Sequence, residues 1–339
     1  MNNQVMIEEI DWSRIPLVAG LAEARAWMTF QACRGLAYNT LDAYGRNLER
    51  YLFFLRQTGV QPWDVKQDQV ALYLHDLLAI SVTAEKESRL ANATIQQHLT
   101  TVRLFHEYLL EEERCKRNVF KQGSGFSSRP LIRREHKLPW IPTDEDWCRV
   151  LAVAAKEPIR NRLMLAMNYD AGLRREELCS LETGDIDPSR RVIRIRSETT
   201  KNRRTRVLPY SAITGELFGL YLQKRRALSM SRGRLFLSES RRNLGQPISI
   251  WSWSKVVRAI AKRADANGFS THTMRHLCLT DLARADWDIH EIATFAGHRN
   301  IETTMIYIHL SARDLAAKFT STMDQVHQRR LELMKELFQ

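Results

Sequence analysis

A short stretch of small and basic residues divides this sequence into two regions that are each expected to fold around their own core. Residues 121–130 contain two Gly, three Ser and one Pro, and the basic residues Arg133, Arg134 and Lys137 follow. Gly, Ser and Pro at this density interrupt helices and strands, so an extended linker is expected. A length of 339 residues also favours two domains. The predicted parts are a first domain at 1–118, a basic linker at 119–140 and a second domain at 141–339.

The first region has the apolar spacing of a helical bundle. Between Leu41 and Leu55, every third or fourth residue is apolar or aromatic, which places them on one helix face. Gly59 is a typical helix stop. The pattern recurs from Ile95 to Leu109, and two further helices are expected around residues 17–32 and 66–79.

The second region is predicted to be mostly helical with a small antiparallel sheet. Thr143, with Asp146 three residues later, resembles a capping box that begins a helix. Residues 191–196 and 204–208 alternate apolar and polar side chains, which is the period of a strand. We therefore predict a β-hairpin with Lys201 in its turn.

The charge of the chain favours a polyanionic partner. Lys and Arg total 51 against 39 Asp and Glu, a formal net charge of +12. Residues 190–242 alone hold 15 Lys or Arg and three Glu. We find no uninterrupted apolar run of about 18 residues and no secretory signal. Nucleic acid is therefore expected as the partner rather than a membrane.

The sequence predicts neither a metal nor a cofactor. The five cysteines are scattered and odd in number, so they suggest neither a disulfide framework nor a metal cluster. They fit a reducing cytoplasm. A Gly-rich Walker loop for ATP phosphates is absent as well.

Four separated motifs carry residues suited to chemistry. They are Gly172-Leu-Arg-Arg-Glu-Glu-Leu178, the hairpin turn with Lys201, His272-Thr-Met-Arg-His276, and Gly297-His298 followed by Tyr307 nine residues after the histidine. Each motif alone has an ordinary structural explanation, such as a surface ion pair or a half-buried core tyrosine. Their order is more informative than any one of them.

Together these motifs resemble the tyrosine recombinase, or phage integrase, family. The order Arg, Lys, His-x-x-Arg, Gly-His, Tyr is that of the family's active site. The resemblance extends over nearly the whole chain. It implies a mainly α fold, with an N-terminal helical core-binding (SAM-like) bundle and a mostly α-helical catalytic domain that holds the small sheet. The two would form a C-shaped clamp on DNA.

The resemblance also implies a reaction and roles for the motif residues. Tyr307 would attack a DNA phosphodiester to form a 3′-phosphotyrosine, without metal or ATP. Arg174, Arg275 and His298 would stabilise the charge that develops on the phosphate, which suits planar guanidinium donors. The two arginines are also expected to lower the pKa of the Tyr307 phenol. The remaining roles are Lys201 as general acid, His272 as proton acceptor, Glu177 as orienting group, and His276 as an assisting or structural residue.

The predicted DNA contacts are basic side chains in the linker and around the hairpin: Arg133, Arg134, Lys137, Arg203, Arg204, Arg206, Arg241 and Arg242. The expected partner is double-stranded DNA with a specific recombination site. Accessory DNA-bending proteins or sister recombinases are expected as further partners.

Residues 311–339 carry an apolar stripe that either folds back on its own domain or docks on a neighbouring protomer. The resemblance favours exchange of this segment between protomers, a homo-tetramer on DNA and a monomer when free. It also implies a location in the bacterial cytoplasm, at the nucleoid. One departure is Asn118-Val119, where the family often has Asn-Pro.

Other functions remain open on the sequence alone. A type IB topoisomerase or a telomere resolvase uses similar chemistry, and a non-catalytic DNA-binding regulator could share the fold. An unrelated basic helical RNA-binding protein would have to contain the ordered motifs by chance. The DNA sequence and the outcome (integration, excision, resolution or transposition) are not encoded in any feature that we recognise.

Overall fold

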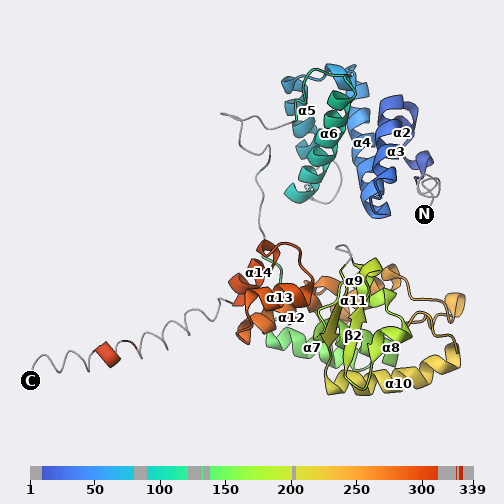
Figure 1. The fold of residues 1–339 in the computed structure, drawn as a ribbon, viewed down its shortest axis with the longest axis vertical. Helices are drawn as coiled ribbons and strands as arrows, with labels where there is room; N and C mark the ends of the chain where they lie inside the picture. The colour runs from blue at the N-terminus through green and yellow to red at the C-terminus, as the bar shows by residue number, and fades with distance from the viewer. Residues whose placement is uncertain are drawn as a thin grey trace, which may run out of the picture. The chain divides into compact units, whose positions relative to one another are not determined.

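The chain forms two compact units, residues 1–136 and 137–339, and each is described by itself (Figure 1). The structure is a computed structural model that describes residues 10–79, 90–120, 132, 138–200, 204–311, 326 and 328–330. Because most of 121–137 lies outside these residues, the linker boundaries at 119 and 140 stay a prediction. In the described ranges no helix is long and apolar enough to cross a membrane.

The first unit is a bundle of helices, as predicted. Its elements are η1 (Trp12–Arg14), α2 (Pro16–Gly20), α3 (Ala22–Cys33), α4 (Tyr38–Thr58), η2 (Pro62–Asp64), α5 (Gln67–Ala79) and α6 (Asn92–Glu111). The stop at Gly59 is confirmed, because this residue follows α4 in the left-handed conformation, with φ of 70°. The helix predicted at 17–32 is divided into α2 and α3, because Leu21 between them is extended.

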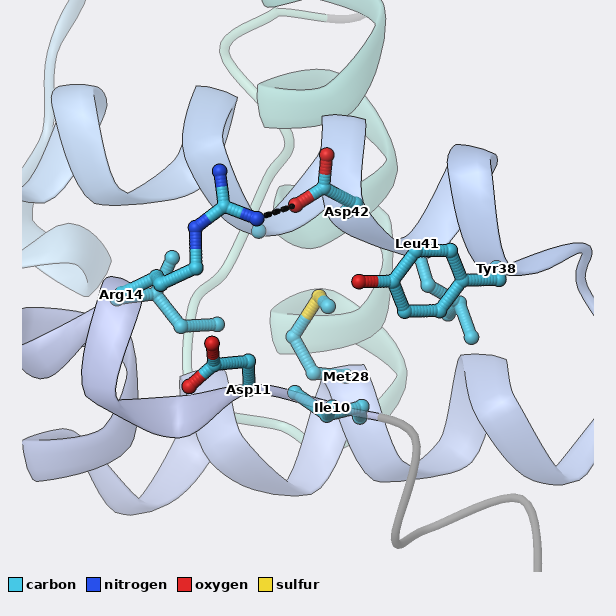
Figure 2. A pocket seen from close by; sticks show the side chains of 9 residues that line it. Ile10, Asp11, Arg14, Met28, Tyr38, Leu41 and Asp42 are labelled. Carbon is cyan, nitrogen blue, oxygen red and sulfur yellow. Dashed lines mark hydrogen bonds and ion pairs between the residues drawn. The ribbon is translucent and has the colours of Figure 1, made fainter. Parts of the chain in front are cut away.

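Aromatic side chains fill the core of the first unit. Trp27, Tyr51 and Phe105 are fully buried, and His106 accepts or donates a hydrogen bond with the Tyr51 hydroxyl at 2.7 Å. A small hollow at the start of α4 has Arg14 and Asp42 on one side and Tyr38 on another (Figure 2). Its volume of about 20 Å³ has room for roughly one water molecule. It is too small for a substrate.

The second unit is mostly helical and contains a three-stranded sheet. Its helices are α7 (Asp144–Ala154), α8 (Ile159–Asp170), α9 (Arg175–Ser180), α10 (Ala212–Leu228), α11 (Ile250–Arg263), α12 (Thr271–Arg284), α13 (Ile289–Ala296) and α14 (Glu302–Ser311), with η3 (Thr183–Asp185), η4 (Ser197–Thr199) and η5 (Arg241–Asn243) between them. The capping box that begins α7 is confirmed, since the Thr143 side chain accepts from the Asp146 amide and Asp146 accepts in return.

The predicted hairpin is present and gains a third strand. Its strands β2 (Val192–Ile195) and β3 (Arg206–Pro209) are antiparallel, and β1 (Ile186–Asp187) pairs with the other edge of β2. The register sets Ile193 opposite Leu208 and Ile195 opposite Arg206. Residues two apart in a strand share a face, so Arg206 lies on the same inward face as the buried Leu208.

Helix α12 is the element that organises the functional end of this unit. It packs against α8, α13 and α14, which bring together segments more than 100 residues apart in the chain (Figure 1). Its N-terminus is fixed by a capping box between Ser270 and Thr273. Because these helices cover α12, its Arg275 is buried and requires partners from the neighbouring segments.

Candidate active site

Arg275 is a buried cation that is held by the ends of two other segments. Its side chain is 4% exposed. It donates to the carbonyl of Gly172, which follows α8, and to the carbonyl of Ala296, the last residue of α13. The C-terminal carbonyls of a helix carry partial negative charge, so they partly compensate the desolvation of this guanidinium. Burial, followed by the nearby charge of Arg174, lowers the pKa of Arg275 to about 10.

Glu177 joins two further arginines to the same place. Its carboxylate accepts from Arg174 at 2.9 Å and from both terminal nitrogens of Arg206, at 3.0 and 2.7 Å. Burial alone raises the pKa of Glu177, but the hydrogen bonds and charge of Arg206, with those of Arg174, outweigh it and the pKa is lowered. Glu177 is therefore an ionised, buried carboxylate that fixes two guanidinium groups.

The turn after α13 holds Arg174 beside Arg275. Arg174 donates to the carbonyl of Gly297 at 3.1 Å, one residue beyond the carbonyl that Arg275 uses. Gly297 is left-handed, with φ of 63°, and a Cβ built there would lie 3.0 Å from the Nη1 atom of Arg206. Glycine is thus favoured by the backbone conformation, and a Cβ there would press on the Arg206 side chain.

Tyr307 lies between two histidine rings. It is 3% exposed and comes from α14. Its hydroxyl oxygen is 3.0 Å from the Nδ1 atom of His276, and its ring is parallel to that of His298, with centroids 6.1 Å apart. His298 in turn places Nε2 3.0 Å from Arg275 and Nδ1 2.9 Å from the Thr304 hydroxyl. The phenol therefore lies beside the arginine cluster, and Arg275 acts directly to lower its pKa.

The protonation states follow from burial and from the surrounding positive charge. Burial, then His272 and Arg275, lowers the pKa of His276 to about 4. Burial, then Arg275 and Arg174, lowers the pKa of His298 to about 3. Both rings are neutral near pH 7. Because Arg275 can only donate, the neutral His298 ring accepts at Nε2 and carries its proton on Nδ1.

The pKa of Tyr307 differs from the expectation. Burial raises it, whereas Arg275 and Arg174 lower it, and burial prevails. The two arginines therefore act in the predicted direction, but they do not make the resting phenol acidic. The reason is that Tyr307 is almost completely removed from water, a cost that the sequence could not reveal.

The structure gathers most of the predicted catalytic set and leaves part of it unplaced. Arg174, Arg275, His298 and Tyr307 meet with the two supporting residues Glu177 and His276. His272 is exposed, one turn before His276 on α12, and it is His276 that contacts the Tyr307 hydroxyl. Lys201, Arg203, Arg133, Arg134 and Lys137 lie outside the described residues. Of the other predicted DNA contacts, Arg204, Arg241 and Arg242 are exposed, whereas Arg206 is occupied by Glu177.

Two members of the cluster had no assigned chemical role in the sequence. The sequence predicts Arg206 as a DNA contact, although the alternation of β3 places it on the face of Leu208 and hence inward. Thr304 is not singled out by the sequence, yet its hydroxyl hydrogen-bonds His298. Strand periodicity could have identified the first residue. The second depends on how α14 packs.

The cluster is suited to binding an anion. Among the described residues it contains three guanidinium groups and one carboxylate, so positive charge remains uncompensated beside Tyr307. Its donors are preorganised by backbone carbonyls and by Glu177, which is the arrangement that stabilises charge developing on a phosphate. No group of three or more possible metal-binding side chains occurs in the part of the chain that the structure describes.

Comparison with known proteins gives relatives along most of the chain. The tyrosine recombinase XerC of Herpetosiphon aurantiacus is 27% identical over 315 residues, covering 91% of this chain and 94% of the relative. The tyrosine recombinase XerD of Corynebacterium glutamicum is 26% identical over 303 residues, covering 86% and 94%.

Solved structures share the fold at lower identity. The XerH site-specific recombinase bound to a palindromic difH substrate has a TM-score of 0.67 and 17% identity, over 88% of this chain and 84% of that one. The Tn1549 transposon integrase in complex with circular intermediate DNA has a TM-score of 0.63 and 19% identity, over 86% and 94%.

Family models match both units. The model of the phage integrase N-terminal SAM-like domain matches residues 27–113. The model of the phage integrase family matches residues 143–313, which is half of the chain and includes every described member of the cluster around Tyr307. This protein therefore belongs to the phage integrase family.

Proposed function

We propose that this protein is a site-specific DNA recombinase, which breaks and rejoins DNA strands through a covalent bond between a 3′ phosphate and Tyr307. The observation that carries the proposal is the position of a neutral phenol beside Arg174 and Arg275, whose charge Glu177 only partly compensates. A phosphodiester is the anion that such a cluster would both attract and activate.

In the cleavage step, the Tyr307 oxygen forms a bond to phosphorus as the bond from phosphorus to the 5′ oxygen breaks. We infer that the phenol proton passes to Nδ1 of His276, which is 3.0 Å away and neutral, rather than to the exposed His272. The resting pKa values of the two groups disfavour this transfer. It becomes favourable only as the bond to phosphorus forms, because the phenol then acidifies and the anionic phosphate stabilises a protonated histidine.

The phosphate would be held by Arg174, Arg275 and His298. In the unliganded site the Nε2 atom of His298 accepts from Arg275, so it has no proton to donate. An entering phosphate would take over the Arg275 donor and raise the pKa of His298, since an anion favours the imidazolium form. His298 would then donate to a non-bridging oxygen. Lys201, by family resemblance, would protonate the departing 5′ oxygen.

The reaction would be reversible without an energy source. The phosphotyrosine conserves the phosphodiester bond energy, and a 5′ hydroxyl from a second strand would attack it and release Tyr307. Exchange between two DNA sites requires several protomers, so we propose a tetramer on DNA, monomers when free, and exchange of the segment around 311–339. Bacterial cytoplasm at the nucleoid is the proposed location, and accessory DNA-bending proteins or sister recombinases are proposed partners.

A plasmid assay separates the candidate functions. The substrate is a supercoiled plasmid with two directly repeated copies of the DNA that flanks the protein's own gene, and the control plasmid has none. We expect two product circles from the first plasmid only. Relaxation of both plasmids without new circles would indicate a topoisomerase, and retarded migration without strand breakage would indicate a non-catalytic DNA-binding protein.

A further inference from the structure

A second cationic pocket adjoins the cluster around Tyr307. It lies between residues 204–206, at the start of β3, and the C-terminal half of α13 with its following turn, and its volume is about 300 Å³. Its wall is shared with the cluster through Arg206, Gly297 and His298. The pocket is much larger than the ~10–15 Å³ that one water needs.

The charged lining of this pocket is entirely basic. Arg204, Arg299 and His290 line it together with Arg206 and His298, and no Asp or Glu does. Arg204 and Arg299 are exposed, and among the described residues no hydrogen bond or ion pair engages their guanidinium groups. Arg206, by contrast, directs both terminal nitrogens to Glu177. Two arginines whose guanidinium groups have no partner among the described residues therefore line a pocket that borders the cluster.

We propose that this pocket binds a second backbone phosphate of the attacked DNA strand, next to the phosphate that Tyr307 attacks, with Arg299 and Arg204 as its ligands. Arginine offers paired donors that match the oxygens of a phosphate. The hydroxyls of Thr205 and Thr294, which also line the pocket, add uncharged donors. The inference rests on the proposed function, because it places a neighbour beside the phosphate bound at Arg174 and Arg275.

The wall that the pocket shares with the cluster favours DNA over a free anion as the source of this phosphate. Each strand of DNA carries a phosphate about every 3.4 Å along the helix axis. A strand with one phosphate in the cluster must bring the next one close to the shared wall. This contact would position the strand and would not read its sequence.

The salt dependence of DNA binding tests the assignment. The probe is a labelled duplex from the DNA next to the protein's own coding sequence, and the affinity is measured as a function of KCl concentration. Arg299→Ala should make the slope of log K against log salt shallower by about 1, the effect of losing one phosphate contact. Arg226→Ala, an exposed arginine of α10 that does not line the pocket, is the matched control and should leave the slope unchanged.

Two further measurements locate the phosphate. In the double variant Arg204→Ala/Arg299→Ala, the slope of log K against log salt should also be shallower by no more than about 1, since the two side chains bind the same phosphate. Single phosphates of the duplex are also replaced by neutral methylphosphonate. At one position this replacement should weaken DNA binding by the wild-type protein and leave binding by Arg299→Ala unchanged. Thermal unfolding should be the same for all variants, because the substituted side chains are exposed.

The outcomes separate this inference from the proposed function. An unchanged slope for Arg299→Ala overturns the inference, even if the wild-type protein forms its Tyr307 adduct. Thermal stabilisation by inorganic phosphate that is lost in Arg299→Ala, with the DNA slope intact, also overturns it and assigns the pocket to a free anion. A shallower slope without any adduct would support the phosphate contact and reject the recombinase.

Discussion

At the scale of single residues, the carboxylate of Glu177 is the group on which the arginine cluster depends. It is 1% exposed and contacts two guanidinium groups, while its neighbour Glu176 is 44% exposed and pairs with Arg175. Removing one partner of a buried ion pair leaves a charge without compensation, whereas an exposed pair contributes little. The adjacent residues thus form a matched comparison.

Glu177→Gln should lower the free energy of unfolding by about 3 kcal/mol, because Arg206 and Arg174 lose their shared counter-charge. Glu176→Gln should change it by less than about 1 kcal/mol. Urea unfolding followed by circular dichroism measures both. Equal effects of the two substitutions would show that Glu177 does not hold the cluster together.

The role of His276 predicts a defect in chemistry without a defect in binding. His276→Asn retains a hydrogen-bonding side chain that cannot take a proton, so the rate of DNA cleavage should fall by about 100-fold or more. Single-turnover cleavage of nicked DNA measures the rate, and gel retardation measures binding. Full activity of His276→Asn would exclude it as the proton acceptor, and rescue of His276→Gly by added imidazole would strengthen the assignment.

At the scale of elements, the end of α13 controls the spacing of the two central arginines. The carbonyls of Ala296 and Gly297 each accept from one guanidinium, and the left-handed turn aims both at the cluster. The same backbone conformation ends α4 at Gly59, where a Cβ would meet open space. Substitutions at the two glycines therefore separate the energetic cost of backbone strain from that of steric contact.

Gly59→Ala should cost about 1 kcal/mol of stability from the positive φ alone. Gly297→Ala should cost more, and it should also slow cleavage, because its Cβ displaces the Arg206 side chain. Thermal unfolding and a cleavage assay on both variants provide the comparison. Normal cleavage by Gly297→Ala would contradict the proposed link between this turn and the site.

Much of this arrangement was predictable from local patterns, and the rest depends on packing. The caps at Gly59 and Thr143, the hairpin and the order of the motifs all follow from short-range signals. The contact of His276 with Tyr307 does not, because His272 and His276 lie on the same helix and only the position of α14 selects between them. The raised pKa of Tyr307 is likewise a consequence of burial among helices distant in sequence.

At the scale of the whole molecule, buried histidines predict a loss of stability in mild acid. Burial lowers the pKa of His106 to about 4 in the first unit, and the pKa values of His276 and His298 are about 4 and 3 in the second. Their unfolded values are near 6.5, so the unfolded chain binds protons more readily between about pH 6.5 and 4. Stability contributed by the neutral rings is complete above that window and is lost as pH falls through it.

Urea unfolding at pH 8, 6.5 and 5 checks this dependence. The midpoint should be nearly constant between pH 8 and 6.5 and should decrease at pH 5, before most carboxylates titrate. His106→Gln should weaken the decrease, because one of the groups with a lowered pKa is removed. A midpoint that is equally high at pH 5 would contradict the neutral, buried state of these rings.

The C-terminal segment is expected to be needed for assembly of the tetramer and not for binding to a single DNA site. Deleting residues 320–339 should reduce formation of the tetramer on two DNA sites, because the apolar stripe that is proposed to dock on a neighbour is lost. Binding to one site should be largely retained. Gel retardation with one-site and two-site DNA distinguishes the two properties, and an equal loss of both would count against protomer exchange.

The most direct test of the central claim is detection of the covalent bond at Tyr307. The protein is incubated with nicked duplex DNA from its own locus, resolved on a denaturing gel, and the DNA-linked peptide is identified by mass spectrometry, beside Tyr307→Phe. We predict a protein–DNA adduct on the peptide that contains Tyr307, and none in the variant, although the variant still binds the DNA. An adduct that persists in Tyr307→Phe, or tight binding of the wild-type protein without any adduct, would contradict the proposed nucleophile.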